Sequence, residues 1–283
     1  MAEVSPSLAD ADVLTVERGL RRLRRRENAE GDKYGRLLVR TFGVPASQLT
    51  WARWMGQYHG RLSDLPVAMR RDQLRLWDRP PLSESPAAIW VHLGLAGLAR
   101  RAGDVEAMER RLELARLQKN APVDARLELL LLDAVVAMDR GQEMDWVPVA
   151  EELLAMEPPD GASYRARMLD QRAYAAARGW REQPSRLHDA LALYDQIPDE
   201  GDPFPRFRRA HGRAWCLWRL QDEGAAEEAD RAVQFAGDAG LMRFRCMALG
   251  LRWRISSEPS DRTRAMNLAL ALQDERLLSG FVS

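Results

Sequence analysis

The sequence predicts an all-α protein built as an array of helical hairpins with an N-terminal helical cap. Gly103, Gly141 and Gly179 lie 38 residues apart, and each closes a run with helical character. Apolar residues recur at a spacing of about 3.6 residues through most of the chain, whereas strand signals are almost absent. A fixed period of this size indicates two-helix units that bury their apolar faces by stacking on one another.

Composition supports a globular protein without a strong electrostatic preference. The chain has 283 residues, of which 46% are hydrophobic and 30% charged, enough for a large core or an extended array. Its 42 basic and 42 acidic residues cancel, so only a local patch could attract nucleic acid. Lys33 and Lys119 are the only lysines, and this arginine excess is typical of a GC-rich, bacterial genome.

Nothing in the sequence predicts secretion, membrane insertion or a disulfide. The first ten residues are acidic and lack an apolar segment, so we expect a cytoplasmic protein. The most apolar stretch, residues 127–138, is shorter than the roughly 20 residues that cross a bilayer and predicts a buried helix. Cys216 and Cys246 lie in apolar helical segments, where we expect two reduced core thiols.

Residues 1–82 lack the repeat and predict a separate region of four helices. The first, over residues 13–28, carries five arginines within six positions: Arg21, Arg22, Arg24, Arg25 and Arg26. This run could contact phosphate or an acidic partner. It could equally be the solvated face of a cap helix, balanced by Glu17, Glu27 and Glu30.

A turn signal follows at Gly43, with Val39 before it and Leu49 after it. Glycine permits a sharp reversal, and the two apolar residues can lock the helices together, as in a helix-turn-helix. The second helix, over residues 47–59, carries aromatic and apolar residues on one face: Trp51, Trp54, Met55 and Tyr58. Such a face is better suited to packing against Leu74, Leu76 and Trp77, or against the first repeat, than to reading base edges.

Residues 83–283 predict the repeat domain. Two apolar stripes mark second helices of hairpins: Val105, Met108, Leu112 and Ala115, then Ala190, Leu193, Tyr194 and Ile197. Ser85 and Pro86 predict a helix start. Residues 158–161 and 199–205 predict the strongest loops.

Four stretches of this domain share a small residue followed by apolar residues at helical spacing. They are Gly103 with Met108, Leu112 and Ala115; Ala190 with Tyr194 and Ile197; Gly224 with Ala229, Val233 and Ala236; and Ala265 with Ala269 and Leu272. A first-helix motif stands at Trp90, Leu93 and Gly94. Over about residues 86–278 the chain resembles the tetratricopeptide repeat family, although its steps of 38 residues, and of 45 from Gly179 to Gly224, exceed the family's length of about 34.

The resemblance implies a concave face, made by the first helices, that holds an extended peptide or a partner helix. The glycine register places nine side chains there: Trp90, Leu93, Arg100, Arg101, Met138, Asp139, His211, Trp218 and Arg254. Since tryptophan and arginine dominate the energetics of interfaces, the expected partner-binding residues are Trp90, Arg100, Arg101, His211, Trp218 and Arg254. Each could instead be a core tryptophan or a solvated charge.

Catalytic signals are weak. The four histidines are scattered without a second ligand at one-turn spacing, and no glycine-rich phosphate cradle or nucleophile elbow is present. Adjacent carboxylates such as Glu151 and Glu152 face different sides of a helix. We therefore expect no enzymatic activity, no metal and no cofactor.

Two functions remain open at this level. The first is a non-enzymatic adaptor or scaffold that binds a protein segment or peptide in its groove. The alternative, which resembles regulators that join a helix-turn-helix to a tetratricopeptide array, is a transcriptional regulator whose N-terminal region binds DNA under control of a bound peptide. Self-association through the apolar C-terminal residues 277–282 is a third possibility.

Overall fold

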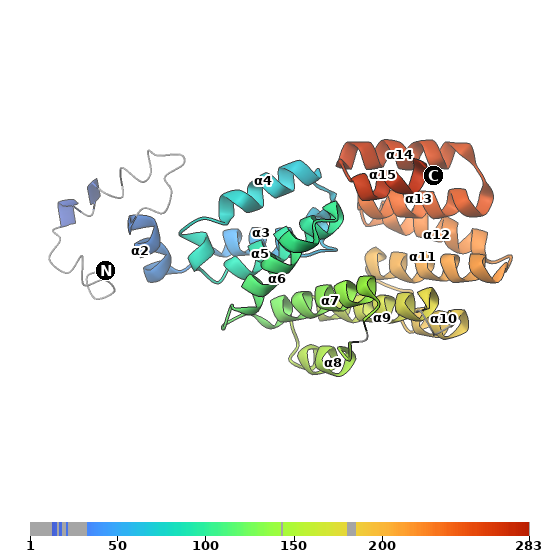
Figure 1. Cartoon of the computed structure of the whole chain (residues 1–283), viewed down its shortest axis with the longest axis horizontal. Helices are drawn as coiled ribbons and strands as arrows, with labels where there is room; N and C mark the ends of the chain where they lie inside the picture. Colours follow the sequence, from blue (N-terminus) through green and yellow to red (C-terminus); the bar gives the residue numbers. More distant parts are fainter. Residues whose placement is uncertain are drawn as a thin grey trace. The chain divides into compact units, whose positions relative to one another are not determined.

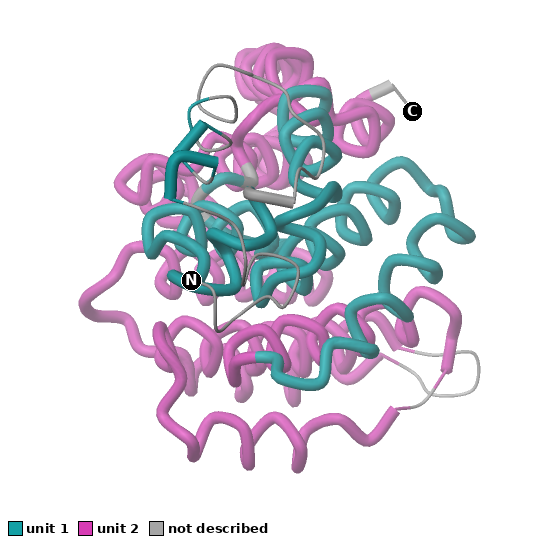
Figure 2. The backbone as a smooth tube through the Cα atoms, turned by 90° about the vertical axis from the view of Figure 1, so that its left-hand side faces the viewer, with its two compact units in different colours: residues 1–62, 68–121 teal, residues 63–67, 122–283 magenta. Residues whose placement is uncertain are grey.

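The computed structural model describes residues 13–15, 17–18, 21, 33–142, 144–179 and 185–282, and its helices are shown in Figure 1. Every regular element within these ranges is a helix, which confirms the all-α prediction. The chain forms two compact units (Figure 2): unit 1 comprises residues 1–62 and 68–121, and unit 2 comprises residues 63–67 and 122–283. The sequence had placed the boundary after residue 82 instead.

From residue 33 onward, unit 1 has five α-helices and a short 3-10 turn; a second 3-10 turn, η3 (Arg61–Asp64), lies across its boundary, and residues 13–15, 17–18 and 21 are also helical. The helices are α2 (Lys33–Phe42), α3 (Ala46–Gly56), α4 (Val67–Trp77), α5 (Ala88–Ala102) and α6 (Val105–Arg116), with η4 (Leu82–Glu84) between α4 and α5. Helix α5 packs against α6 as a hairpin and also against α3. The α5–α6 hairpin is therefore part of unit 1.

Glycine explains why α5 belongs with the N-terminal helices. A Cβ on Gly56 of α3 would lie 2.5 Å from the carbonyl oxygen of Trp90 in α5. On α5, a Cβ at Gly94 would lie 2.8 Å from the Met55 carbonyl oxygen, and one at Gly97 would lie 2.9 Å from the Tyr58 ring. Helices approach this closely only where side chains are absent. The contact therefore depends on glycines from both segments, Gly56 on α3 and Gly94 and Gly97 on α5.

The described residues of unit 2 form four consecutive helix pairs and a final helix. The pairs are α7 (Val123–Arg140) with α8 (Val147–Ala155), α9 (Gly161–Arg178) with α10 (Leu187–Asp195), α11 (Pro203–Leu220) with α12 (Ala225–Asp238), and α13 (Met242–Ser256) with α14 (Pro259–Leu272). Helix α9 contacts both α7 and α11, and α11 contacts α13, so the first helices of successive pairs are neighbours. Helix α15 (Glu275–Val282) packs against the last pair.

The predicted glycine series ends the helices where expected. Gly103, Gly141 and Gly179 follow α5, α7 and α9 with φ of 73°, 71° and 67°, values that favour glycine. After α11 and α13 the left-handed position is held by Gln221 and Ser257. Gly224 is the N-cap of α12 with a φ of −66°, and the predicted apolar residues Ala229, Val233 and Ala236 follow it in that helix.

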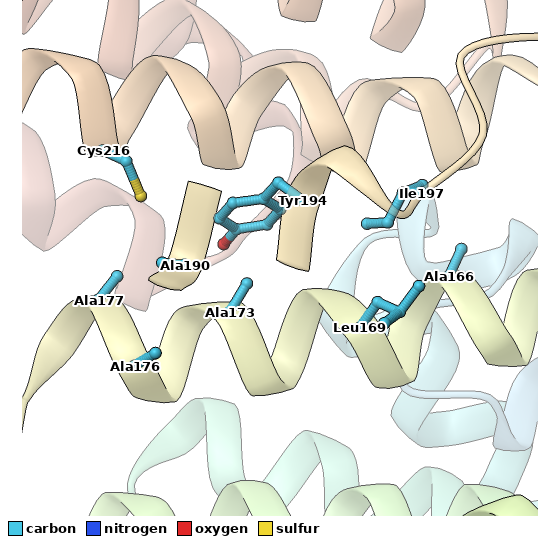
Figure 3. Packing of buried hydrophobic residues seen from close by; sticks show 9 residues of the cluster. All are labelled: Ala166, Leu169, Ala173, Ala176, Ala177, Ala190, Tyr194, Ile197 and Cys216. Atoms are coloured by element: carbon cyan, nitrogen blue, oxygen red, sulfur yellow. The ribbon is translucent and has the colours of Figure 1, made fainter. Parts of the chain in front are cut away.

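The centre of unit 2 is an alanine-rich core between α9, α10 and α11 (Figure 3). Ala173 of α9 and Ala190 of α10 are completely buried, and the ring of Tyr194 lies between these helices and α11. A Cβ on Gly212 of α11 would lie 2.0 Å from Cζ of Tyr194. Small residues at the crossings thus create the space that one tyrosine fills.

Buried charges connect successive first helices. The Arg167 guanidinium of α9 donates to the Glu128 carboxylate of α7 at 2.6 Å, and Arg208 of α11 donates to Asp170 of α9 at 2.5 Å. The sequence separations are 39 and 38 residues, close to the glycine period. Gln171 also donates to the Leu131 carbonyl oxygen at 3.2 Å. These bonds fix the register of α7, α9 and α11.

The C-terminal helix covers the last pair. Phe281 is 4% exposed and packs over Gly250 of α13, where a Cβ would lie 2.8 Å from its ring. Arg262 donates to the Phe281 carbonyl oxygen at 2.6 Å, and Leu277 and Leu278 join the same apolar cluster. The expectation that these C-terminal residues expose an apolar surface is therefore corrected, because they pack against α13 and α14 of their own chain.

Two further features of unit 2 concern a helix start and the thiols. Asp64 caps α13, since its carboxylate accepts from the backbone amides of Met242 at 2.6 Å and Arg243 at 2.9 Å. Residues 63–67, which contain Asp64, therefore belong to unit 2 although the residues on either side of them belong to unit 1. Cys216 and Cys246 are free and buried, which confirms the predicted core thiols.

Candidate protein-binding site

The predicted partner-binding residues of α5 lie inside unit 1. Trp90 is 1% exposed and packs over Gly56. Arg101 is buried and donates to the Tyr58 carbonyl oxygen at 3.1 Å, while Arg100 donates to the Tyr58 hydroxyl. The expectation that Trp90 and Arg101 face a groove is corrected, because Trp90 packs against Gly56 of α3 and Arg101 donates to Tyr58, which follows α3.

The other three predicted residues lie in unit 2, on α11 and α13. Burial lowers the pKa of His211, which is half-buried, and the neighbouring Asp170 carboxylate acts in the opposite direction. Trp218 is half-buried beside the Ala214 and Leu251 cluster. Arg254 is exposed and donates to the Gly280 carbonyl oxygen of α15 at 3.3 Å. All three thus pack or hydrogen-bond within their own unit, and only Arg254 is largely exposed.

The predicted nucleic-acid contacts fall mostly outside the described residues. Arg21 is helical and exposed, and it pairs with Glu17 at 3.3 Å. Arg22, Arg24, Arg25 and Arg26 lie outside the described ranges. The one described member of the run is therefore a balanced surface charge.

The predicted helix-turn-helix segment corresponds to α2 and α3. Gly43 has a φ of 75° at the turn between them, and its amide donates to the Val39 carbonyl oxygen at 2.9 Å. Met55 and Tyr58 lie against α5, the helix that the sequence predicted to begin the first repeat. Trp51 is 47% exposed and meets Trp54 edge-to-face, with 5.8 Å between the ring centroids.

Unit 2 has a surface channel that could hold a partner, whereas most of the predicted partner-binding side chains are buried or half-buried. It consists of two depressions that share Trp146 and Ala175, and we refer to them together as the Trp146 channel. One depression, of about 340 Å³, is also lined by Ala134, Met138, Gln142, Met144, Asp145 and Gln171. The other, of about 480 Å³, is also lined by Arg172, Ala176, Gly179, Arg186, Asp189, Ala192, Leu193 and Gln196.

Local sequence positions the walls of this channel. Trp146 is the residue before α8, and its carbonyl oxygen accepts from the Ala150 amide at 3.0 Å, so the first turn of α8 holds the backbone of the tryptophan. Ala175 and Ala176 of α9 line the channel with short apolar side chains. Met138 adds a flexible apolar wall from α7.

The charges of the channel are unevenly paired. Arg186 and Asp189 form an ion pair at 3.5 Å across one rim. Arg172 of α9 lines the same depression, and within the described part of the chain no carboxylate lies within ion-pair distance of its guanidinium. A carboxylate or carbonyl oxygen of a bound segment could therefore be its partner.

The described lining of the channel is made of apolar, amide and charged side chains. The described residues of both depressions include no histidine, cysteine or hydroxyl side chain. Across the described ranges, no group of three histidine, cysteine or carboxylate side chains is placed to hold a metal ion. No helix in those ranges combines the length and apolar character needed to span a membrane.

The glycine register predicted a binding-face position for Met138, whereas no sequence pattern predicted Trp146 or Arg172. The missed signal is local: Trp146 stands in the short connection after the Gly141 cap, directly before a helix with proline in its first turn. Trp146 is half-buried, because it packs against the apolar cluster of α7, α8 and α9 and also lines the channel. Which helix it faces is decided by packing, so its partners could not be listed in advance.

Comparison of this chain with protein-family models, curated proteins and solved structures finds no match.

Proposed function

We propose that this protein is a non-enzymatic cytoplasmic adaptor of tetratricopeptide-like architecture that binds a protein segment in the Trp146 channel. The stacked helix pairs of unit 2 and the near-38-residue spacing of its buried ion pairs support the repeat architecture. Repeat arrays of this kind function mainly by presenting an extended surface to a partner.

The observation that carries the proposal is the pair of depressions that share Trp146. Alternate side chains of an extended segment point to the same side and lie about 6.6 Å apart, so two neighbouring depressions can receive residues i and i+2. Trp146 contacts both side chains, and tryptophan is among the residues that contribute most to interfaces. Arg172 then pairs with a carboxylate or a backbone carbonyl oxygen of the segment.

The adaptor is favoured over the DNA-binding regulator by the surface of α3. Its exposed side chains include Ser47, Thr50 and Trp51, and Arg53 is the helix's one basic residue. A recognition helix binds with polar side chains on base edges and cations on phosphates. The exposed tryptophan on α3 is a poor match to either task.

The proposal is tested by selecting peptides from a random display library on the purified full-length protein. The affinity of each selected peptide is then measured by fluorescence anisotropy for the parent and for Trp146→Ala. We expect Trp146→Ala to weaken binding about tenfold or more, since loss of a central aromatic anchor costs at least about 1.4 kcal/mol.

Trp51→Ala is the matched control, because it removes an exposed tryptophan from unit 1. It should leave affinity within about twofold while circular dichroism shows unchanged helicity in both variants. Selection of no peptide, or equal binding by Trp146→Ala, would refute the channel. Enrichment of defined DNA fragments by the protein in a parallel selection would favour the regulator.

A further inference from the structure

A second depression in unit 2, distinct from the Trp146 channel, lies between α12 and α14 over α13. It has a volume of about 450 Å³ and is lined by Val233, Arg245, Leu249, Arg264, Asn267 and Leu268. We refer to it as the α13–α14 groove. Leu249 is buried in its floor, while Val233 and Leu268 are half-buried, so the groove presents aliphatic surface between two arginines.

The two groove arginines differ from the other arginines of α13 described next, because neither is paired with a carboxylate in the described ranges. On α13, Arg243 pairs with Asp274 at 3.2 Å, and Arg252 contacts Asp261 at 2.7 Å and Asp230 at 2.8 Å. Arg245 and Arg264 are both exposed, and neither forms an ion pair within the described ranges. In a chain with equal numbers of acidic and basic residues, two uncompensated cations flank one apolar groove.

The spacing of these residues gives the groove a direction. Arg245 and Leu249 are four residues apart on α13, and Arg264 and Leu268 are four apart on α14, so each pair shares a helix face. The two helices form an antiparallel hairpin whose turn follows Ser256. Counting residues from that turn, the order along the groove is Arg264, Leu249, Leu268, Arg245.

A helical rise of 1.5 Å per residue sets the two arginine backbones about 9 Å apart along the hairpin. Long side chains on a helix lean toward its N-terminus. Arg245 therefore leans away from the turn and Arg264 toward it, so the two guanidinium groups lie farther apart than the two backbones. Carboxylates at positions i and i+7 of a helix lie on one face about 10.5 Å apart. Apolar residues at i+3 and i+4 of the same helix fall between them, opposite Leu249 and Leu268.

We propose that the α13–α14 groove docks an acidic amphipathic helix of a partner protein, with carboxylates at i and i+7 and apolar residues at i+3 and i+4. One carboxylate pairs with Arg264 and the other with Arg245, while the apolar residues cover Leu249 and Leu268. The occupant is assigned by charge complementarity, because a neutral or basic helix would leave both guanidinium groups facing no counter-charge. The groove is independent of the Trp146 channel and shares no lining residue with it.

The test uses a fluorescein-labelled, alanine-based helical peptide of about 16 residues with glutamate at i and i+7 and leucine at i+3 and i+4. Its binding to the full-length protein is followed by fluorescence anisotropy. Arg245→Gln and Arg264→Gln should each weaken binding about three- to fivefold, and the double variant about tenfold or more. Raising the salt concentration from about 50 to about 300 mM should also weaken it.

Arg165→Gln is the matched control, since Arg165 is an exposed arginine of α9 outside the groove, and it should bind like the parent. A charge swap gives an independent readout: the double variant Arg245→Glu with Arg264→Glu should prefer the peptide in which lysine replaces both glutamates. Absence of binding, equal binding of the lysine peptide by the parent, or arginine variants within twofold of the parent would overturn the proposal. Loss of binding in Trp146→Ala but not in the arginine variants would also overturn it, because the peptide would then occupy the Trp146 channel.

Discussion

Glu128→Ala is expected to destabilise unit 2 by about 3 to 5 kcal/mol, because it leaves a buried guanidinium without its carboxylate. The Glu128 and Arg167 side chains are 1% and 5% exposed, and their closest charged atoms are 2.6 Å apart. The Tyr164 hydroxyl also lies 3.5 Å from the Glu128 carboxylate. Since the pair bridges α7 and α9, the loss falls on the contact between two successive helix pairs.

The expected loss of stability comes mainly from leaving the Arg167 charge buried away from water, and less from losing its attraction to Glu128. Removing one partner of a buried pair costs several kcal/mol, whereas replacing both by apolar residues of similar size is often neutral. Glu128→Leu combined with Arg167→Met should therefore recover most of the stability lost in Glu128→Ala. A native protein is stable by about 5 to 15 kcal/mol, so the single substitution would remove a large part of the total.

Urea unfolding followed by circular dichroism at the helical band provides the assay. Asp139→Ala is the matched control, because Asp139 and Arg178 join the same two helices at 3.7 Å but are 33% and 49% exposed. That solvated pair should contribute less than about 1 kcal/mol. If Glu128→Ala lowers the unfolding midpoint no more than Asp139→Ala, the buried pair does not hold α7 against α9 and the reasoning fails.

Three further predictions concern packing, thiol reactivity and pH. Gly212→Ala should destabilise the protein by about 1 to 3 kcal/mol, because its Cβ would meet the Tyr194 ring at 2.0 Å; thermal melting measures this, and an unchanged melting temperature would contradict the packing. Burial raises the pKa of Cys216 and of Cys246 to about 12, so both thiols should resist a disulfide reagent at about pH 8 until urea unfolds the chain; rapid labelling of the native protein would disprove this. Burial lowers the pKa of His211 from 6.5, so its stabilising contribution is present above that pH and is lost as the pH falls toward the folded-state pKa. His211→Gln should therefore show a smaller loss of urea midpoint between about pH 7 and pH 5 than the parent, and an equal loss would show that this histidine is not responsible.

The site is only partly recoverable from sequence, for a reason visible in its residues. Met138 could be placed on a binding face because its position one turn before a glycine cap follows from helical periodicity. Trp146 could not, because its neighbours come from α7, α9 and α10 and no local pattern links them. Trp90 was assigned to a groove because the sequence does not show that Gly56 lies against it.

The sequence by itself determined the helices and where several of them stop. Gly103, Gly141 and Gly179 mark helix ends because a left-handed residue is cheapest for glycine, and this preference acts within a few residues. Gln221 and Ser257 adopt the same conformation without that signal, held by the structure around them. Tertiary structure alone decided that α5 joins unit 1, that α15 covers the last pair, and that a channel opens beside Trp146. These outcomes depend on shape complementarity between residues far apart in the chain, which periodicity and capping do not encode.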